Sequence, residues 1–576
     1  MELKTLTQLQ KNLKKDASPF PVFKLAVVGD CSTQLLCTAL KGTAYDEGIN
    51  LRVFEADYDQ LQAQLMDKES ELHAFGPRAV LIYLCTEKLY EAYCGLTQEA
   101  RSGFADMLME KISSYWDRAG TIVLQTTFIE ADDRVFGNFA ARLPSSFLYQ
   151  VKRLNLLIME GCQRQSGVFI IDINGLAAKL GYDRVRDPRL YYHAKLPLTA
   201  TALPYAAKEI IDVIKAVEGR VMKCVVCDLD NTLWGGVIGD DGLEGIELGE
   251  LGDGAAFTAL QRWLKELKNR GIILCVCSKN EEAAAKEPFE KHPDMVLRLE
   301  DISVFIANWQ DKAANIRLIQ KTLDIGMDSL VFIDDNPFER EAVRSLIPEI
   351  CVTDLPEDPA EYLPYLQSLN LFETASFSEE DSKRTEQYRA EFGRVRQQEL
   401  FSSYEHYLKS LEMTAEAEPF SSFWFPRIAQ LTQRSNQFNL RTVRYTEADI
   451  ARLAEDEGYV TLYFTLKDNF GDYGLIAVVI LEKQADNLFI HEWLMSCRVL
   501  KRGMEEFIAD KILSTAAELG FKTVTGEYIP TKKNAMVAQL YEKLGFSPLG
   551  GGLFRAEVKN YTPHKTYIKE AKAEMQ

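Results

Sequence analysis

Short runs of apolar residues, separated by helix-like segments, recur along the first two thirds of the chain and constrain its fold more than any other feature. In the first part of the chain the runs are FKLAVVGD, AVLIYLC, GTIVLQT and GVFIIDI. Apolar strands that alternate with helices are typical of a parallel sheet, because such strands are buried on both faces. The sequence therefore predicts an N-terminal α/β domain over residues 1–215.

A second set of apolar runs repeats this pattern over residues 220–370. The strands expected there are VMKCVVCDLD, IILCVCSK, DMVLRL, SLVFIDD and EICVTD. A helical segment closed by Gly271 separates the first two of them, and a glycine is the usual residue just beyond a helix end. We expect a second parallel sheet here.

The remainder of the chain has a different character. Residues 375–415 are highly charged and predict a solvated helical connector. Residues 420–565 contain two apolar runs around a glycine-containing turn, then a third run and a long helical segment, which predicts an α+β domain. The length of 576 residues agrees with about three or four domains.

Charge and composition narrow the partners and the compartment. The formal net charge is -19, which argues against a general nucleic-acid binder, because neutralising phosphates requires clustered Lys and Arg. No apolar run approaches the roughly 20 residues needed to span a bilayer, and the first residues lack the apolar core of a signal peptide. The 11 cysteines fit buried thiols better than a disulfide framework. We expect a cytoplasmic protein with no nucleic-acid or membrane partner.

Two carboxylates follow the first strand of the second region. Asp228 and Asp230 are two residues apart, so an extended chain would point both carboxylates the same way. Such a pair repels unless a cation lies between its members, and hard oxygen ligands suit Mg²⁺ and a phosphate-bearing substrate. Asn231 and Thr232 can hold the following turn through side-chain hydrogen bonds. Ligands of open α/β sheets bind beyond the carboxyl ends of the strands, where these residues lie.

The ends of later strands add what a phosphoryl site needs. Ser278 offers a hydroxyl to a phosphate oxygen, and Lys312, near a helix start, can neutralise charge on a transferring phosphoryl group. Asp334 and Asp335 can complete the metal shell. The ordered set is a stronger signal than a lone Asp-x-Asp pair, which can be structural.

The set D-x-D-x-T, Ser, Lys and D-D resembles that of the haloacid dehalogenase (HAD) superfamily. The stretch CDLDNTLWGGVIGDDGLEGIELG resembles its FkbH-like branch, also called HAD-IIIC, and RIAQLTQRSNQFNLRT resembles the signature that follows the phosphatase-like domain in that branch. The resemblance covers most of the chain. It implies an N-terminal SGNH-like or flavodoxin-like α/β domain, a central HAD-type Rossmann-like sheet without a large cap, and a C-terminal GNAT-like α+β domain.

The resemblance also implies roles for individual residues. Asp228 would be the nucleophile that takes the phosphoryl group as an aspartyl-phosphate, and Asp230 the general acid and then base. Ser278 and Lys312 would hold the phosphoryl group. The implied Mg²⁺ ligands are Asp228, Asp230 through its backbone carbonyl, Asp334 and Asp335.

The segment from Trp234 to Gly242 would be a small flap over an open site. The candidate substrate-binding residues are Asn231, Thr232, Trp234, Gly235, Gly236, Asn280, Arg434 and Asn436. For Arg434 and Asn436 a structural hydrogen-bond network is an equal alternative.

Family members implicated in loading three-carbon units use a bisphosphoglycerate, release phosphate and pass a glyceryl group to an acyl carrier protein. Some of them carry a Cys between the two aspartates, where this chain has Leu229. We therefore expect a Mg²⁺-dependent enzyme that dephosphorylates a small, glycerate-like acid and loads the acyl unit onto a carrier protein. A plain phosphatase with recognition domains and a scaffold with a vestigial site are the alternatives.

Two weaker motifs remain. The segment VVGDCSTQ resembles the G-D-S turn of SGNH hydrolases, with Cys31 in place of the serine and Ser32 beside it; Asp187 and His193 are the nearest match to the partner motif. A hydrolase using Cys31 or Ser32 is one reading. The preferred reading is a strand-to-helix turn in a domain kept for binding or scaffolding.

In the C-terminal region a CoA cradle would use Arg498, Lys501 and Gly503, with Lys501 replacing the usual first glycine. Asn534 and Tyr541 match the closing GNAT helix. Tyr541 is either a general acid or a packing aromatic on an amphipathic helix.

Overall fold

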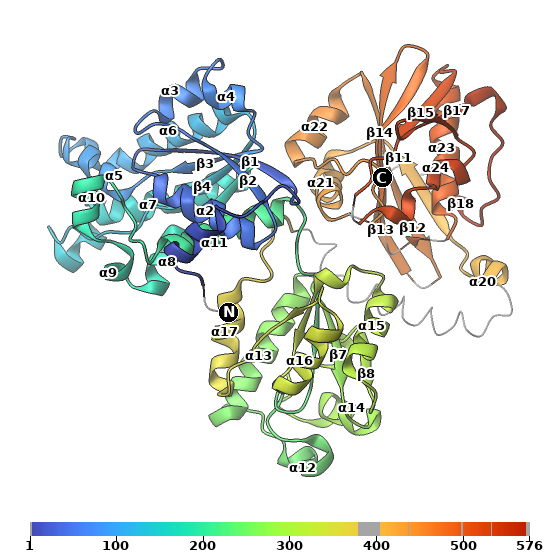
Figure 1. Ribbon diagram of the computed structural model, residues 1–576, viewed down its shortest axis with the longest axis horizontal. Coiled ribbons are helices and arrows are strands. Elements are labelled where there is room, and N and C mark those ends of the chain that lie inside the picture. Colours follow the sequence, from blue (N-terminus) through green and yellow to red (C-terminus); the bar gives the residue numbers. More distant parts are fainter. Residues whose placement is uncertain are drawn as a thin grey trace. The chain divides into compact units, whose positions relative to one another are not determined.

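The computed structural model describes residues 3–377 and 404–571, except Asn436, Phe470, Cys497, Arg498, Lys501 and Lys532. The chain divides into two compact units, Met1–Ala216 and Val217–Gln576, which are described separately (Figure 1). Most of the connector expected over 375–415 lies outside the described residues. Within them, α20 spans Tyr404–Ser410 and strand β11 begins at Thr414. No described helix combines the length and apolarity needed to cross a membrane.

The first unit contains the predicted parallel α/β sheet, with five strands in the order β2-β1-β3-β4-β5. The strands are β1 (Val22–Gly29), β2 (Asn50–Glu55), β3 (Ala79–Tyr83), β4 (Ile122–Thr126) and β5 (Val168–Ile171). The helices are α1 (Leu6–Asn12), α2 (Gln34–Asp46), α3 (Leu61–Met66), α4 (Glu71–Phe75), α5 (Thr86–Cys94), α6 (Phe104–Ala119), α7 (Phe147–Arg164), α8 (Ile173–Leu180), α9 (Tyr182–Val185), α10 (Pro188–Ala194) and α11 (Leu203–Val217). Every residue of β3 and β4 is buried, so helices cover both faces of the sheet (Figure 1). Strand β2 was not among the expected strands, because this edge strand buries only one of its residues and lacks a continuous apolar run.

The second sheet is also parallel, in the order β10-β9-β6-β7-β8. Its strands are β6 (Cys224–Cys227), β7 (Ile273–Ser278), β8 (Val304–Ala307), β9 (Leu330–Ile333) and β10 (Cys351–Val352). Its helices are α12 (Ile238–Gly245), α13 (Gly252–Asn269), α14 (Glu282–Lys291), α15 (Lys312–Leu323), α16 (Pro337–Leu346) and α17 (Tyr362–Leu369). One apolar cluster joins the sheet to α13, α14 and α17, and a second joins its other face to α15 and α16. The expected helix stop is confirmed, since Gly271 has a left-handed φ of 96° after α13.

One expected strand of this sheet is wrong. The run DMVLRL is not a strand, and β8 follows it instead. The backbone N–H groups of Val296 and Leu297 donate to the side-chain oxygen of Gln261, at 2.9 and 3.2 Å, and that of Arg298 donates to Asp301. These donors are satisfied by side chains rather than by a neighbouring strand. The run is apolar because Met295 and Leu297 enter the core.

The C-terminal domain has the predicted α+β, GNAT-like character. Its eight strands lie in the order β16-β17-β15-β14-β13-β12-β11-β18. They are β11 (Thr414–Glu418), β12 (Tyr459–Asp468), β13 (Gly471–Gln484), β14 (Asn487–Met495), β15 (Thr523–Glu527), β16 (Ser547–Gly550), β17 (Leu553–Glu557) and β18 (Lys569–Glu570). Besides α20, the helices are α21 (Phe425–Arg434), α22 (Glu447–Glu455), α23 (Met504–Glu518) and α24 (Leu540–Lys543). The antiparallel hairpin of β12 and β13 is confirmed. Because β18 pairs with β11, ordered structure continues past residue 565.

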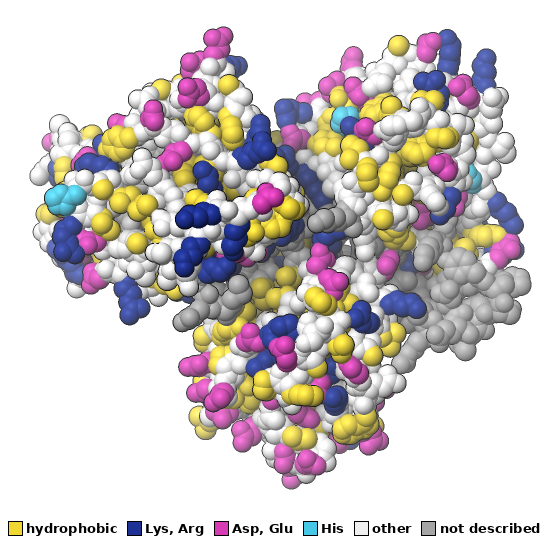
Figure 2. Space-filling model, in the orientation of Figure 1, with side chains coloured by type: hydrophobic (Ala, Val, Ile, Leu, Met, Phe, Trp, Pro, Cys, Tyr) yellow, Lys and Arg dark blue, Asp and Glu magenta, His cyan; other side chains and the backbone are white. Residues whose placement is uncertain are grey.

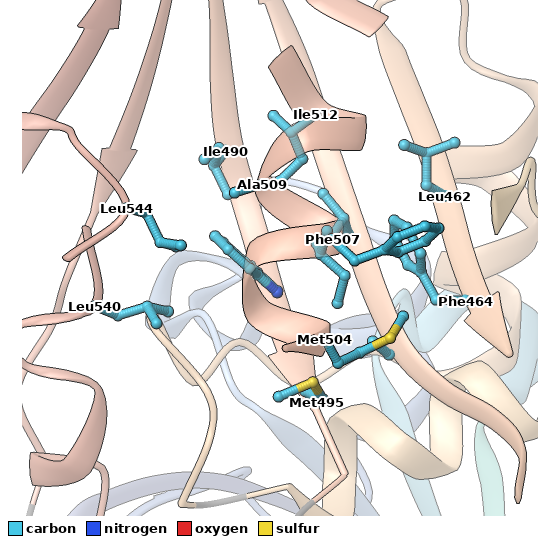
Figure 3. Close-up of a cluster of buried hydrophobic side chains, with 14 of the residues drawn as sticks. Leu462, Phe464, Ile490, Met495, Met504, Phe507, Ala509, Ile512, Leu540 and Leu544 are labelled. Atoms are coloured by element: carbon cyan, nitrogen blue, oxygen red, sulfur yellow. The ribbon is translucent and has the colours of Figure 1, made fainter. Parts of the chain in front are cut away.

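Helices cover both faces of this sheet. Helices α21 and α22 contribute to one apolar cluster and α23 to another. Figure 3 shows the second cluster, in which Phe507 of α23 lies against Phe464 of β12, with ring centroids 6.3 to 6.5 Å apart as edge-to-face packing requires; the centroid separation is 6.4 Å. On the molecular surface, acidic and basic side chains lie interspersed over the visible face of each part (Figure 2).

Gly526 in β15 tests how tightly this core is packed. A Cβ at Gly526 would lie 2.3 Å from the hydroxyl oxygen of Tyr541, which is 1% exposed. We expect Gly526→Ala to lower the free energy of unfolding by about 1–3 kcal/mol, because the buried ring has no room to move. Urea unfolding of the full chain measures it.

The matched control is Gly167→Ala, where a Cβ would meet nothing within 4 Å. Equal stabilities of the two alanine variants would contradict the close packing of β15 on Tyr541.

Candidate active site

A buried ion-pair triad lies at the carboxyl edge of the second sheet. Asp228 follows β6, Asp334 follows β9, and Lys312 is the first residue of α15. The Lys312 Nζ lies 2.7 Å from Asp228 Oδ2 and 2.5 Å from Asp334 Oδ2. Burial alone would lower the pKa of Lys312, but the charges of the two aspartates outweigh it and raise that pKa above its usual value. The ammonium therefore stays charged beside Asp228.

Three carboxylates meet at this point. Asp228, Asp334 and Asp335 each place an oxygen within 4.8 Å of the others. Burial and the charge of Asp228 raise the pKa of Asp334 to about 6, and the same two causes raise the pKa of Asp335. One lysine does not balance three carboxylates, and the Asp228 Oδ1 atom is buried without a hydrogen-bond partner in the described part of the chain. The excess charge and this unpaired oxygen fit a divalent cation with oxygen ligands.

The carboxylate of Asp230 lies apart from this cluster. Its Oδ1 accepts hydrogen bonds from the Trp234 indole and the Ile238 backbone, both at 3.0 Å, and its Oδ2 accepts one from Asn280 at 2.8 Å. A cation between the carboxylates of Asp228 and Asp230, expected from an extended chain, is thus not what the structure favours. The strand ends at Cys227, and the turn that follows removes the strand alternation. Asp230 stays a predicted metal ligand only through its backbone carbonyl.

The two residues after Asp230 hold the turn. Asn231 adopts a left-handed φ of 52° and accepts a hydrogen bond from Gly236 N at 3.0 Å. The Thr232 hydroxyl donates to Asp335 Oδ1 at 3.0 Å and accepts from the Asp335 N–H at 3.1 Å. The turn-holding role expected for both residues agrees with these bonds. Thr232 is fully buried and orients Asp335, so its predicted contact with substrate has no support here.

The flap is short. Between β6 and β7 the chain forms only α12 and α13, so this interval contains no large cap. The Trp234 ring is fully buried, edge-on to Phe289, and orients Asp230 rather than facing a ligand. Gly235 pairs with Glu247 through two backbone hydrogen bonds, and Gly236 has a left-handed φ of 86°. Both glycines thus shape the base of the flap.

Asn280 links two of the predicted catalytic residues. Its Nδ2 donates to Asp230 and also to the Ser278 hydroxyl, at 3.2 Å. Ser278 is 2% exposed and Asn280 is 4% exposed, so both are held firmly. Ser278 lies at the end of β7, beside the strand that precedes Asp228, where a phosphate oxygen is expected.

Arg340 was missed at the level of sequence. Its Nη1 donates to the backbone carbonyls of Asp334 and Asp335, at 2.8 and 2.6 Å, and therefore fixes the loop that carries both carboxylates. Only its place one helical turn into α16, just after the two aspartates, could have suggested this role.

The remaining predicted contacts lie in the C-terminal domain. The side chain of Arg434, all of Asn436, and the CoA-cradle residues Arg498 and Lys501 lie outside the described residues, so these predictions stand as they were. Gly503 precedes α23 with a left-handed φ of 84°. Asn534 is fully buried, and its amide donates to the carbonyls of Asn439 and Ile529, which is a structural role.

Tyr541 is buried with no hydrogen-bond partner for its hydroxyl in the described part of the chain. Burial raises its pKa far above the usual value. It packs between Phe546 and Phe554, with ring centroids 5.2 and 5.3 Å away. These facts favour the packing aromatic over the general acid. Burial also raises the pKa of Glu492, on β14, to about 7, and sequence reasoning had missed this residue.

The signature segment after α21 closes a seam in the C-terminal sheet. β14 pairs with β15 only from Asn487 to Ile490. Beyond that point, Asn439 bridges to Leu494, whose other edge is already paired with β13. The Ile529 N–H donates to the Leu440 carbonyl at 2.9 Å. Residues 438–440 therefore lie between β14 and the chain that follows β15.

The hydrolase reading of the N-terminal turn is not supported. Cys31 is 3% exposed, and burial raises the pKa of its thiol well above the usual value, which disfavours a thiolate nucleophile. Asp187 caps α10 and pairs with Arg189, while His193 is exposed. The Ser32 N–H donates to the Lys195 carbonyl at 2.9 Å, as a structural turn would.

Comparison with known proteins agrees with the central and N-terminal domains. The family model for the N-terminal domain of FkbH matches residues 24–215. A crystal structure of the N-terminal part of the protein BF1531 from Bacteroides fragilis, containing a phosphatase domain complexed with Mg, is 45% identical with a TM-score of 0.63. The match covers 65% of this chain and 100% of that chain. The chain belongs to the FkbH-like family of the haloacid dehalogenase superfamily.

The C-terminal domain of this FkbH-like protein matches acetyltransferases much more distantly. The ribosomal-protein-S18-alanine N-acetyltransferase from Escherichia coli is 18% identical with a TM-score of 0.20, over 25% of this chain and 94% of that chain. Ard1 from Thermoplasma volcanium is 17% identical with a TM-score of 0.20, over 25% of this chain and 95% of that chain. The comparison with curated proteins found no match.

The carboxylate cluster predicts that Mg²⁺ stabilises the fold. Adding Mg²⁺ to metal-free protein should raise the melting temperature, because the ion relieves the repulsion among Asp228, Asp334 and Asp335. The gain is about 2.7 kcal/mol when free Mg²⁺ is a hundredfold above its dissociation constant. Differential scanning calorimetry measures it.

Asp334→Asn should abolish the rise. Asp294→Asn, which changes an exposed carboxylate of the same domain, should keep it. A rise of the same size in Asp334→Asn would place the Mg²⁺ elsewhere.

Proposed function

We propose that this FkbH-like protein is a Mg²⁺-dependent phosphohydrolase that acts on a phosphorylated small acid. The observation that carries the proposal is Asp228 itself. One of its oxygens is paired with the charged Lys312, and the other is buried without a partner beside two further carboxylates. The complex of the Bacteroides fragilis relative with Mg supports the choice of ion.

The proposed reaction has two displacements at phosphorus. A carboxylate oxygen of Asp228 attacks phosphorus, the bond from phosphorus to the leaving oxygen breaks, and Asp230 donates a proton to that oxygen. Asp230 then takes a proton from water, whose oxygen attacks the aspartyl-phosphate, releases inorganic phosphate and restores Asp228. Lys312 stabilises negative charge on the phosphoryl oxygens in both steps.

Bound Mg²⁺ would withdraw negative charge from the phosphoryl group, held by Asp228, Asp334, Asp335 and the backbone carbonyl of Asp230. The surrounding residues supply orientation. Trp234 and Asn280 hold Asp230, and Arg340 holds the loop of Asp334 and Asp335.

The finer proposal is that the acyl unit passes to an acyl carrier protein. The short flap supports it, because a site without a large cap admits a bulky or protein-borne partner. The acyl group would not travel on a thiol of this domain. Leu229 occupies the position of the family cysteine, and burial raises the pKa of the Cys227 thiol far above its usual value.

Loss of Asp228 or Asp230 tests the chemistry. Phosphate release from a phosphorylated three-carbon acid should be abolished in Asp228→Asn, which lacks the nucleophile, and slowed about 10²–10⁴-fold in Asp230→Asn, which lacks the acid and base. Phosphate release is measured with Mg²⁺ present. Mass spectrometry of acid-quenched protein should detect a phosphoryl group on Asp228.

Asp294→Asn serves as the surface control. Undiminished turnover in Asp228→Asn would contradict the proposal. No turnover by the parent protein on any phosphorylated three-carbon acid would favour the scaffold with a vestigial site. A mass gain on added carrier protein supports acyl transfer, and phosphate release alone supports the plain phosphatase with recognition domains.

A further inference from the structure

A cavity of about 440 Å³ lies in the N-terminal α/β domain, separate from the residues of the phosphohydrolase site. Its walls come from the first turns of α5, the loop after β4, the start of α7, and residues 186–192 around the start of α10. α5 and the loop after β4 follow the carboxyl ends of parallel strands, where open α/β sheets bind ligands. The volume lies within the range typical of small-molecule sites.

Aromatic side chains form much of the wall. Tyr90 and Phe147 pack edge to face, with ring centroids 4.8 Å apart. Tyr191 and Tyr192 face the cavity from α10 with centroids 6.1 Å apart. Tyr192 is 75% exposed although it is large and aromatic. Such a wall suits a ligand with an apolar or aromatic body.

The polar part of the wall is strongly acidic. Glu87, Glu91, Asp132 and Asp133 line the cavity, and Arg186 is the only cation among the lining residues. Arg186 is already paired with Glu87. This leaves three carboxylates in the wall without a cation of the wall as partner.

Neighbouring groups neutralise these three only in part. Lys88 Nζ lies 3.8 Å from Glu91, and Arg134, which is 74% exposed at its side chain, lies 3.3 Å from Asp132. Asp133 accepts a hydrogen bond from the Val135 N–H at 3.2 Å and has no ion-pair partner in the described part of the chain. An anionic ligand would be repelled here, and a neutral one would leave the carboxylates unpaired.

We propose that this cavity binds a small organic amine, with the ammonium group held by Glu91 and Asp133 and the body packed among the tyrosines. An ammonium satisfies the acceptors of the carboxylates and is also attracted to the faces of aromatic rings. The site binds rather than catalyses, since the nearby Cys31 is buried and its neighbouring Ser32 is tied into the backbone of the turn.

Three probes that share one ring and differ in charge test this proposal on the full chain. They are tyramine, the neutral 4-ethylphenol, and the anionic 3-(4-hydroxyphenyl)propanoate. Isothermal titration at low salt should show that tyramine binds at least about tenfold more tightly than 4-ethylphenol, because its hydrogen bonds are charge-assisted. The anion should not bind.

The variants locate the site. Glu91→Gln and Asp133→Asn should each weaken tyramine binding by about threefold to tenfold without changing that of 4-ethylphenol, since only the charge is lost. Tyr192→Ala should weaken both ligands, because it removes part of the apolar wall. Glu110→Gln, an exposed residue of α6 outside the cavity, should change neither.

The proposal is overturned if the three probes bind equally, or if none binds. It is also overturned if the preference for tyramine survives in the Glu91→Gln, Asp133→Asn double variant. Circular dichroism of each variant checks that the fold is intact. The phosphohydrolase site is untouched by these changes, so phosphate release should stay at the parental rate.

Discussion

The buried contact of Lys312 with Asp228 and Asp334 is the interaction on which the site depends. Removing one partner would leave a buried charge uncompensated, which is far more costly than breaking a surface ion pair. The contact also joins three separate segments, because the two aspartates follow different strands and the lysine begins a helix. Asp311 caps that helix through its bond to the Ala313 N–H, and so fixes where Lys312 enters the edge of the sheet.

Around this contact, neutral and backbone hydrogen bonds set the direction of each carboxylate. Thr232 orients Asp335, Trp234 and Asn280 orient Asp230, and the resulting arrangement separates two aspartates that are neighbours in sequence. One belongs to the charged cluster, and the other stands apart from it with its own donors. This separation suits a division between nucleophile and acid–base residue, because each carboxylate has a different electrostatic environment.

The strand ends of the central sheet could be predicted because buried parallel strands leave continuous apolar runs, and the polar residues after them share one edge. The direction of the Asp230 side chain could not, since it depends on the left-handed conformation of Asn231. The run DMVLRL is apolar through burial alone, and its N–H groups bond to side chains. Strand β2 lies at an edge and has no apolar run. Arg340 and the N-terminal cavity depend on tertiary contacts between distant segments, which no local pattern encodes.

Residues 438–440 act within the C-terminal sheet as a built-in donor strand. They satisfy backbone groups on β14 beyond the point where β15 stops pairing with it, and they tie the chain after β15 to the same place. Exposed strand edges are templates for pairing with other chains. A fragment of this domain that starts after residue 440 would expose that edge. Its solubility on isolation thus depends on keeping a stretch that lies, in sequence, well before the strand it protects.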